Sequence, residues 1–226
     1  GEFSQAAVRS SAAILGVALN TNIYGNAGMV PMMVLSAVPF FNVYAVLILQ
    51  FSPHTDEDGR LIPPERNGAA AVKRALVNVV KNPIILGILL GVPFSLLRVK
   101  LPGILASTLS TIGGTATPVA LLAVGASFSG SEAAKCLKPA LAATAIKLFI
   151  LPAIFLPIAA LFGFTGSAMI AILILVGSPT TVSCYVMAKN MGHRGVLTSN
   201  VVMLATVLSS VSLTLWIFLL RLFGLL

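Results

Sequence analysis

An apolar run that stops short of crossing a bilayer is the strongest constraint on how this chain folds. The run extends from Ala168 to Val176 and is interrupted by Gly177, Ser178 and Pro179. Because Pro179 has no N–H to donate and its ring clashes with the preceding turn, a carbonyl near residue 175 should lose its helical partner. In hydrocarbon such a carbonyl costs several kcal/mol, so we expect the break to be buried in protein or to line a wet cavity.

Small hydroxyl side chains surround this break, namely Ser178, Thr180, Thr181 and Ser183. A broken helix at the membrane midplane that carries small polar groups is typical of a transporter binding site. The alternative is a proline kink whose hydroxyls bond back to their own carbonyls. These residues by themselves favour the two interpretations equally.

The composition indicates a membrane protein that crosses the bilayer several times. Of the 226 residues, 58% are hydrophobic and 9% are charged, against roughly 25% charged residues in a soluble domain. The net charge is +8, but the basic residues are scattered singly, which is against nucleic-acid binding and agrees with the positive-inside rule. Cys136 and Cys184 match no metal or redox spacing, so we expect two free thiols and no metal or cofactor.

The hydropathy pattern predicts seven membrane segments, with a solvated loop over residues 52–68 and an amphipathic interfacial helix over 69–81. The second, 29–51, contains Pro39 and Asn42, and the sixth is the broken one. The segments cover residues 10–24, 29–51, 82–97, 102–128, 139–164, 166–189 and 196–220.

Basic residues at alternate ends of these segments predict the orientation. One side holds ten of the fourteen, and three lie on the other side: Arg98, Lys100 and Arg221. Arg9 is counted with the ten, and Lys147 lies within the membrane. The side with ten should face the cytoplasm, so the C-terminus should lie outside the cell.

The first and sixth segments resemble each other, since each is an apolar run that turns polar midway and precedes a long helix. They enter the membrane from opposite sides, which suggests an inverted repeat. On this interpretation residues 1–51 are the last two helices of a first repeat, 52–81 are a cytoplasmic loop with its interfacial helix, and 82–226 are a complete second repeat of five helices. Three helices of the first repeat are then expected to precede Gly1.

Several short motifs, in order and over essentially the whole chain, resemble the auxin efflux carrier family of permeases, which has bacterial members. Ser11 stands where the family often has Asn, and Ala18 stands where it often has Pro. The motifs are Phe3-Ser-Gln-Ala-Ala-Val-Arg-Ser-Ser11 with Gly16-Val-Ala-Leu and Tyr24-Gly25, Pro39-Phe-Phe-Asn-Val43, Lys81-Asn-Pro-Ile-Ile-Leu-Gly87, Thr117-Pro-Val-Ala-Leu-Leu-Ala-Val-Gly-Ala-Ser127, and Ser178-Pro-Thr-Thr with Tyr185-Val-Met-Ala-Lys189.

This resemblance implies an all-α integral membrane protein with ten helices in two inverted repeats, whose broken helices cross at the substrate site. It also implies a secondary transporter in the cell membrane for a small organic anion such as a carboxylate, able to form a homodimer. The segments contain no Asp, Glu or His, which argues against an intramembrane enzyme. The alternative function is a seven-helix membrane receptor or sensor without transport activity.

We expect the substrate to bind at the second break, where Ser178, Pro179, Thr180, Thr181 and Ser183 lie, because the amides of a half-helix N-terminus suit a carboxylate. Asn20 and Asn22 are candidates from the opposing segment; Asn20 would otherwise cap a helix end. Lys147 either neutralises the anion or extends to the cytoplasmic interface.

Overall fold

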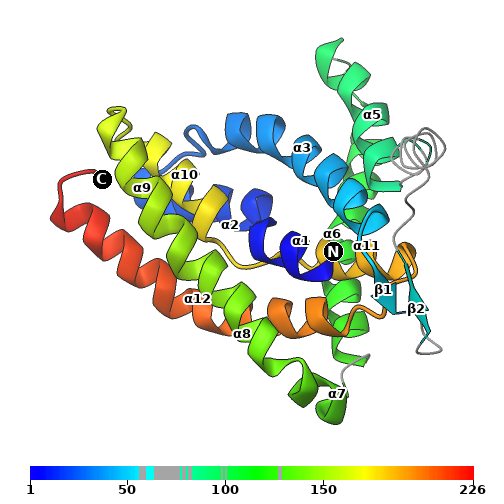
Figure 1. Cartoon of the computed structure of the whole chain (residues 1–226). Coiled ribbons are helices and arrows are strands. Elements are labelled where there is room, and N and C mark those ends of the chain that lie inside the picture. Colours follow the sequence, from blue (N-terminus) through cyan, green and yellow to red (C-terminus); the bar gives the residue numbers. More distant parts are fainter. Residues whose placement is uncertain are drawn as a thin grey trace.

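The structure is a computed structural model, and it describes residues 1–55, 60–63, 77, 80, 83–97, 99, 101–126 and 129–226 (Figure 1). The regular secondary structure of these residues is helical apart from one short pair of strands. Its helices are α1 (Glu2–Val8), α2 (Ala12–Tyr24), α3 (Val30–Gln50), α5 (Pro83–Leu96), α6 (Gly103–Ala126), α7 (Gly130–Lys135), α8 (Leu137–Ala145), the π-helix η1 (Ile146–Ile150), α9 (Leu151–Leu161), α10 (Gly166–Gly177), α11 (Ser183–Asn190) and α12 (Val196–Leu222).

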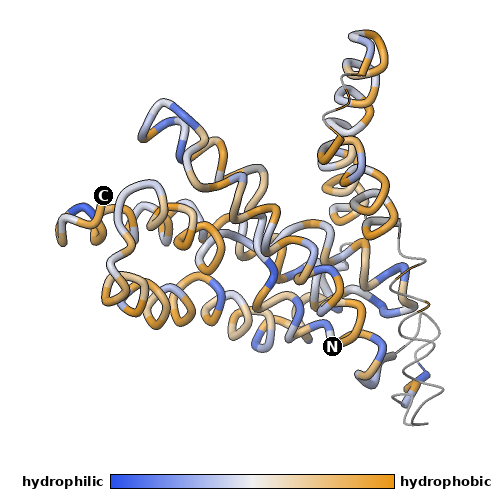
Figure 2. The backbone as a smooth tube through the Cα atoms, turned by 90° about the horizontal axis from the view of Figure 1, so that it is seen from above, coloured by the Kyte–Doolittle hydropathy of each residue, from blue (hydrophilic) through white to orange (hydrophobic). Residues whose placement is uncertain are grey.

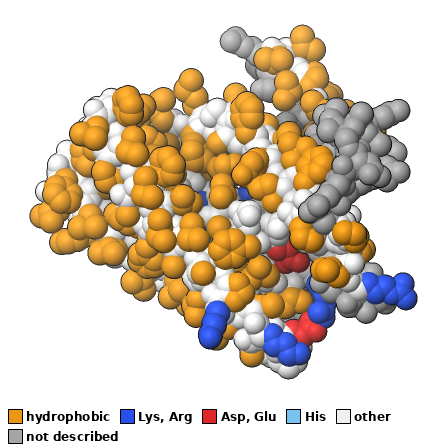
Figure 3. Space-filling model, in the orientation of Figure 1, with side chains coloured by type: hydrophobic (Ala, Val, Ile, Leu, Met, Phe, Trp, Pro, Cys, Tyr) orange, Lys and Arg blue, Asp and Glu red, His pale blue; other side chains and the backbone are white. Residues whose placement is uncertain are grey.

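Four helical stretches in the described part of the chain are long and apolar enough to cross a membrane: Val30–Gln50, Gly103–Ala126, Leu137–Leu161 and Val196–Leu222. The backbone is mostly hydrophobic along the helices (Figure 2). The visible face of the molecule is covered by apolar side chains, and charged ones gather at the end where α7 lies (Figure 3). Such a surface suits lipid, so the predicted all-α membrane fold is confirmed.

The loop predicted over residues 52–68 is described only in part. Within it, β1 (His54–Thr55) pairs antiparallel with β2 (Leu61–Ile62), in the register His54 to Ile62. The amphipathic helix predicted over 69–81 lies almost wholly outside the described residues.

The predicted break in the sixth segment is confirmed. Helix α10 ends at Gly177, Ser178 is extended with φ −75° and ψ 157°, and α11 begins at Ser183. The segment therefore consists of two half-helices joined by a non-helical stretch that contains Pro179.

The first segment is also broken, and the prediction that it begins near residue 10 was wrong. A short helix, α1, precedes Arg9, which is extended with φ −68° and ψ 138°, and α2 starts at Ala12. The break thus lies at residues 9–11, while Asn20 and Asn22 belong to the far end of α2. This end is closed by Gly25 in the left-handed conformation, at φ 75°.

Helix α10 lies at the centre of the bundle, against α9, α2 and α3, while α5 and α6 stand apart, α5 beside α3 and α6 beside α11 (Figure 1). Buried Ile170 and Ile174 of α10 pack with Ala12 of α2. Gly16 allows this close approach, since a Cβ there would lie 2.7 Å from Val30 Cγ1 and 3.2 Å from Ile174 Cγ2. Small residues at helix contacts are how membrane helices pack closely.

We therefore predict that Gly16→Ala lowers the melting temperature in detergent, because the added methyl overpacks the contact at a cost of about 1–3 kcal/mol. The matched control is Gly113→Ala in α6, where a Cβ meets nothing within 4 Å. The control should be neutral or slightly stabilising. Equal melting temperatures for the two variants would contradict the packing described for α2.

Candidate functional site

The two broken segments cross each other, and their breaks are hydrogen-bonded together. The Ser11 N–H donates to the Pro179 carbonyl at 2.9 Å. The Thr180 hydroxyl donates to the Ala6 carbonyl at 2.7 Å, and Gln5 Nε2 donates to the Cys184 carbonyl at 3.3 Å. The Ser11 N–H and the carbonyls of Pro179 and Ala6 lie at the breaks or at the end of α1, so each break supplies partners for backbone groups of the other, as a membrane interior requires.

Four helix ends meet at this crossing, and they differ in charge. Helices α1 and α10 end there, so their last carbonyls carry negative partial charge, while α2 and α11 begin there, so their first amides carry positive partial charge. A cation is therefore favoured beside the ends of α1 and α10, and an anion beside the starts of α2 and α11.

Lys147 binds the negative side of the crossing. Its ammonium donates to the carbonyl of Val8 at 3.0 Å, to the carbonyl of Leu175 at 3.1 Å and to the Ser10 hydroxyl, which itself donates to Leu175. The side chain is 0% exposed, so the alternative that it extends to the interface is wrong. Leu175 is the residue whose carbonyl Pro179 was predicted to leave without a helical partner, and Lys147 and Ser10 supply the replacement.

A local π-helix carries Lys147. The elements α8, η1 and α9 form one uninterrupted helix, and η1 is its π-helical part, Ile146–Ile150. Four residues after Leu148 stands Pro152, which has no N–H to donate back to the Leu148 carbonyl. The indole N–H of Trp216 donates to this carbonyl instead, at 2.9 Å. Single π-turns inside α-helices are frequent at functional sites.

Arg9 occupies the positive side and is 4% exposed. One terminal nitrogen, Nη2, donates to Asn42 Oδ1 at 2.7 Å and to the Ser183 hydroxyl at 2.9 Å, and Nη1 lies 3.4 Å from the Met187 sulfur. The acidic residues that the structure describes, Glu2 and Glu132, bond elsewhere. Among the described residues, Arg9 is thus a buried cation without a carboxylate partner.

Arg9 lines a cavity of about 160 Å³. The first turns of α2 and α11 contribute to its wall, so the cavity is placed where two helix N-termini face it. A guanidinium and two helix starts around one space favour an anion there, because each carries positive charge or partial positive charge. The lining residues are Arg9, Ser10, Ser11, Ala12, Ala13, Val38, Phe41, Asn42, Thr181 and Ser183.

The structure brings the residues predicted around Pro179 to the crossing, in different surroundings. Thr181 and Ser183 line the cavity, with their hydroxyls 3.2 Å apart. The Thr180 hydroxyl already donates its proton to the Ala6 carbonyl. Ser178 is fully buried, and its hydroxyl has no partner in the part of the chain that the structure describes.

The asparagines predicted from the opposing segment lie away from the crossing. Asn20 is buried and donates from Nδ2 to the Asn26 carbonyl at 2.8 Å, which closes the turn after α2. Asn22 is exposed. Asn20 therefore stabilises the turn at the end of α2, which agrees with the alternative that it caps a helix end.

Arg9 and Asn42 are the site residues that the sequence reasoning missed. Arg9 was counted among the cytoplasmic basic residues because it preceded the apolar run, and the structure corrects that placement. Asn42 is a polar residue inside an otherwise apolar segment, and it is 1% exposed. That signal was present in the sequence, since a buried amide in a membrane helix needs a partner.

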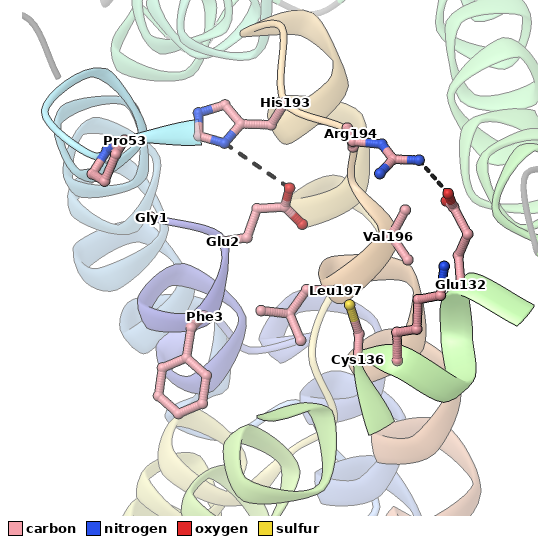
Figure 4. A pocket seen from close by; sticks show the side chains of 11 residues that line it. Gly1, Glu2, Phe3, Pro53, Glu132, Cys136, His193, Arg194, Val196 and Leu197 are labelled. Atoms are coloured by element: carbon pink, nitrogen blue, oxygen red, sulfur yellow. Dashed lines mark hydrogen bonds and ion pairs between the residues drawn. The ribbon is translucent and has the colours of Figure 1, made fainter. Parts of the chain in front are cut away.

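A second cavity, of about 400 Å³, lies where α1 and α12 begin (Figure 4). The Glu2 carboxylate accepts from the N–H groups of Gly195 at 3.0 Å and Thr198 at 3.1 Å, and Glu132 pairs with Arg194. The charged groups named here are thus matched to each other or to a helix N-terminus. The contacts around this cavity link α1 to the start of α12, whereas the crossing holds a cation that has no carboxylate partner among the described residues.

Apolar helices interrupted twice at one buried polar crossing define a membrane protein of the transporter class. A family model described as "Membrane transport protein" matches residues 4–217. Nearly the whole chain is matched, so it belongs to this family, that of the auxin efflux carriers, and the resemblance found in the sequence is confirmed. A search of curated proteins gave no match.

We predict that Thr180→Val destabilises the fold, because the Ala6 carbonyl loses its donor inside the bundle while the side-chain volume is conserved. The expected loss is about 1–3 kcal/mol, seen as a lower melting temperature in detergent. Thr214→Val is the control, since Thr214 is exposed and its hydroxyl bonds its own helix. If the two variants had the same melting temperature, the hydrogen bond from Thr180 to Ala6 would not contribute to stability.

Proposed function

We propose that this protein is a secondary carrier for a small organic anion such as a carboxylate, which binds in the cavity at Arg9. The observation that carries the proposal is a buried guanidinium with no carboxylate partner among the described residues, beside the first turns of two half-helices. A buried charge of this kind is costly unless it is paired. A substrate carboxylate would supply the missing partner.

The size and lining of the cavity favour a small substrate. About 160 Å³ is well below the roughly 300–1,000 Å³ of pockets for drug-sized ligands. Arg9 Nε–H and one Nη1–H make no hydrogen bond to other described residues, so donors remain for a carboxylate. The Thr181 and Ser183 hydroxyls bond to each other, so one of the two adds a donor at the same wall.

Movement of the substrate across the membrane would follow from the crossing. In our proposal the chain provides two helices of one repeat (1–51), a cytoplasmic loop (52–81) and a complete inverted repeat (82–226) of a ten-helix carrier in the cell membrane. One bundle rocks against the other around the crossing, which opens the cavity to each side in turn. A homodimer is the proposed assembly.

The test is binding of malonate, malate and an indole carboxylic acid to the complete gene product, measured by calorimetry, followed by uptake in liposomes. We predict that Arg9→Gln weakens binding of the recognised acid about 10- to 100-fold, the value of one hydrogen bond to a charged group. Arg221→Gln is the control, since Arg221 is exposed at the end of α12.

The cavity is tested separately by Thr181→Val, which leaves Arg9 and its bonds in place and should weaken binding less than Arg9→Gln. Binding that neither variant changes would place the substrate elsewhere. Binding without any flux in liposomes would instead support a sensor.

The proposed orientation has its own test. With Arg9 removed from the count, nine basic residues lie on the side assigned to the cytoplasm and three on the other side, so we still expect Leu226 outside. A phosphatase that is active only outside the cytoplasm should therefore work when fused after Leu226. Activity only from a fusion in the 52–68 loop would reverse the orientation.

A further inference from the structure

The ammonium of Lys147 sits in a ring of oxygen atoms that resembles the coordination of a small cation. Its partners are the Val8 carbonyl at 3.0 Å, the Leu175 carbonyl at 3.1 Å and the Ser10 hydroxyl, and they come from both broken segments. The side chain is completely buried, and α1 and α10 both end at this ring. All three protons of the ammonium are therefore used to hold the crossing together.

The ring is suited to one positive charge and no more. Its members are two carbonyls and a hydroxyl, all neutral, whereas divalent cations in proteins usually require carboxylate ligands. The negative charge at the ring comes from the ends of two helices, each equivalent to about half an elementary charge. Two helix ends together thus balance about one monovalent cation.

We propose that Lys147 is a tethered cation, which permanently occupies a monovalent-cation site between the two breaks. The protein then closes its crossing without a bound alkali metal ion. Shortening the side chain to alanine should open the site to ammonium, potassium or sodium. If the proposed function also holds, on which this consequence rests, the wild-type protein binds its anion independently of these ions.

Two further buried hydroxyls, close to the ring in sequence, are candidate ligands for a free ion. The Ser178 hydroxyl, within one turn of Leu175, and the Thr144 hydroxyl, within one turn of Lys147, are buried without a partner among the described residues. An ammonium on a side chain needs three acceptors, whereas a free cation generally takes more ligands.

The test measures the melting temperature of the complete gene product in detergent, in choline chloride and then with ammonium, potassium or sodium chloride at constant chloride. Lys147→Ala should melt low in choline and gain about 3–5 °C, saturably, with at least one of the small cations. Lys147→Met, which fills the space without a charge, should melt low in every salt. Wild-type protein and Lys138→Ala, an exposed lysine of the same helix, should show no ion-specific change.

Each other outcome overturns the proposal. A saturable rise in the wild-type melting temperature would reveal a separate ion site. A Lys147→Ala variant that ignores all three ions, or that cannot be purified folded in any of them, would show that no free cation replaces the ammonium. No carboxylate is present in this assay, so its result is independent of the proposed function. Anion binding by wild-type protein in choline medium tests the consequence for transport.

Discussion

A backbone group inside a membrane must find a partner in the protein, and the structure around the crossing depends on this constraint. Two helices stop in the bundle, and each leaves carbonyls and amides that water would otherwise satisfy. They are satisfied by each other, through Ser11 and Pro179, and by Lys147. The close approach that this requires is provided by Gly16, which lets α2 pack against α3 and α10.

The same crossing separates opposite needs for charge. Lys147 lies where α1 and α10 end, and Arg9 lies beside the cavity where α2 and α11 begin. The Lys147 ammonium has all its protons in hydrogen bonds that connect the two breaks. Arg9 retains unused donors and lacks a carboxylate partner in the described part of the chain. The difference explains why we assign the structural role to Lys147 and the anion to Arg9, although both are buried.

Local chemistry made part of this site predictable. Pro179 removes a donor wherever it stands in an apolar run, so the break, the orphaned carbonyl at Leu175 and the nearby hydroxyls followed from the sequence. The first break contains no proline and is stabilised by contacts with distant residues, so local pattern placed it wrongly. Arg9 resembled a flanking charge because its partners, Asn42 and Ser183, are distant in sequence. The π-turn that carries Lys147 was also not predicted from the sequence.

A structure of the complete gene product with a bromine-labelled carboxylate bound would show whether the substrate anion binds at Arg9 in the crossing. We predict that the carboxylate lies within hydrogen-bonding distance of Arg9, between the first turns of α2 and α11, and that Lys147 is still bound to Val8 and Leu175. A carboxylate found on the Lys147 ammonium, or in the cavity beside Glu2 and Glu132, would contradict it.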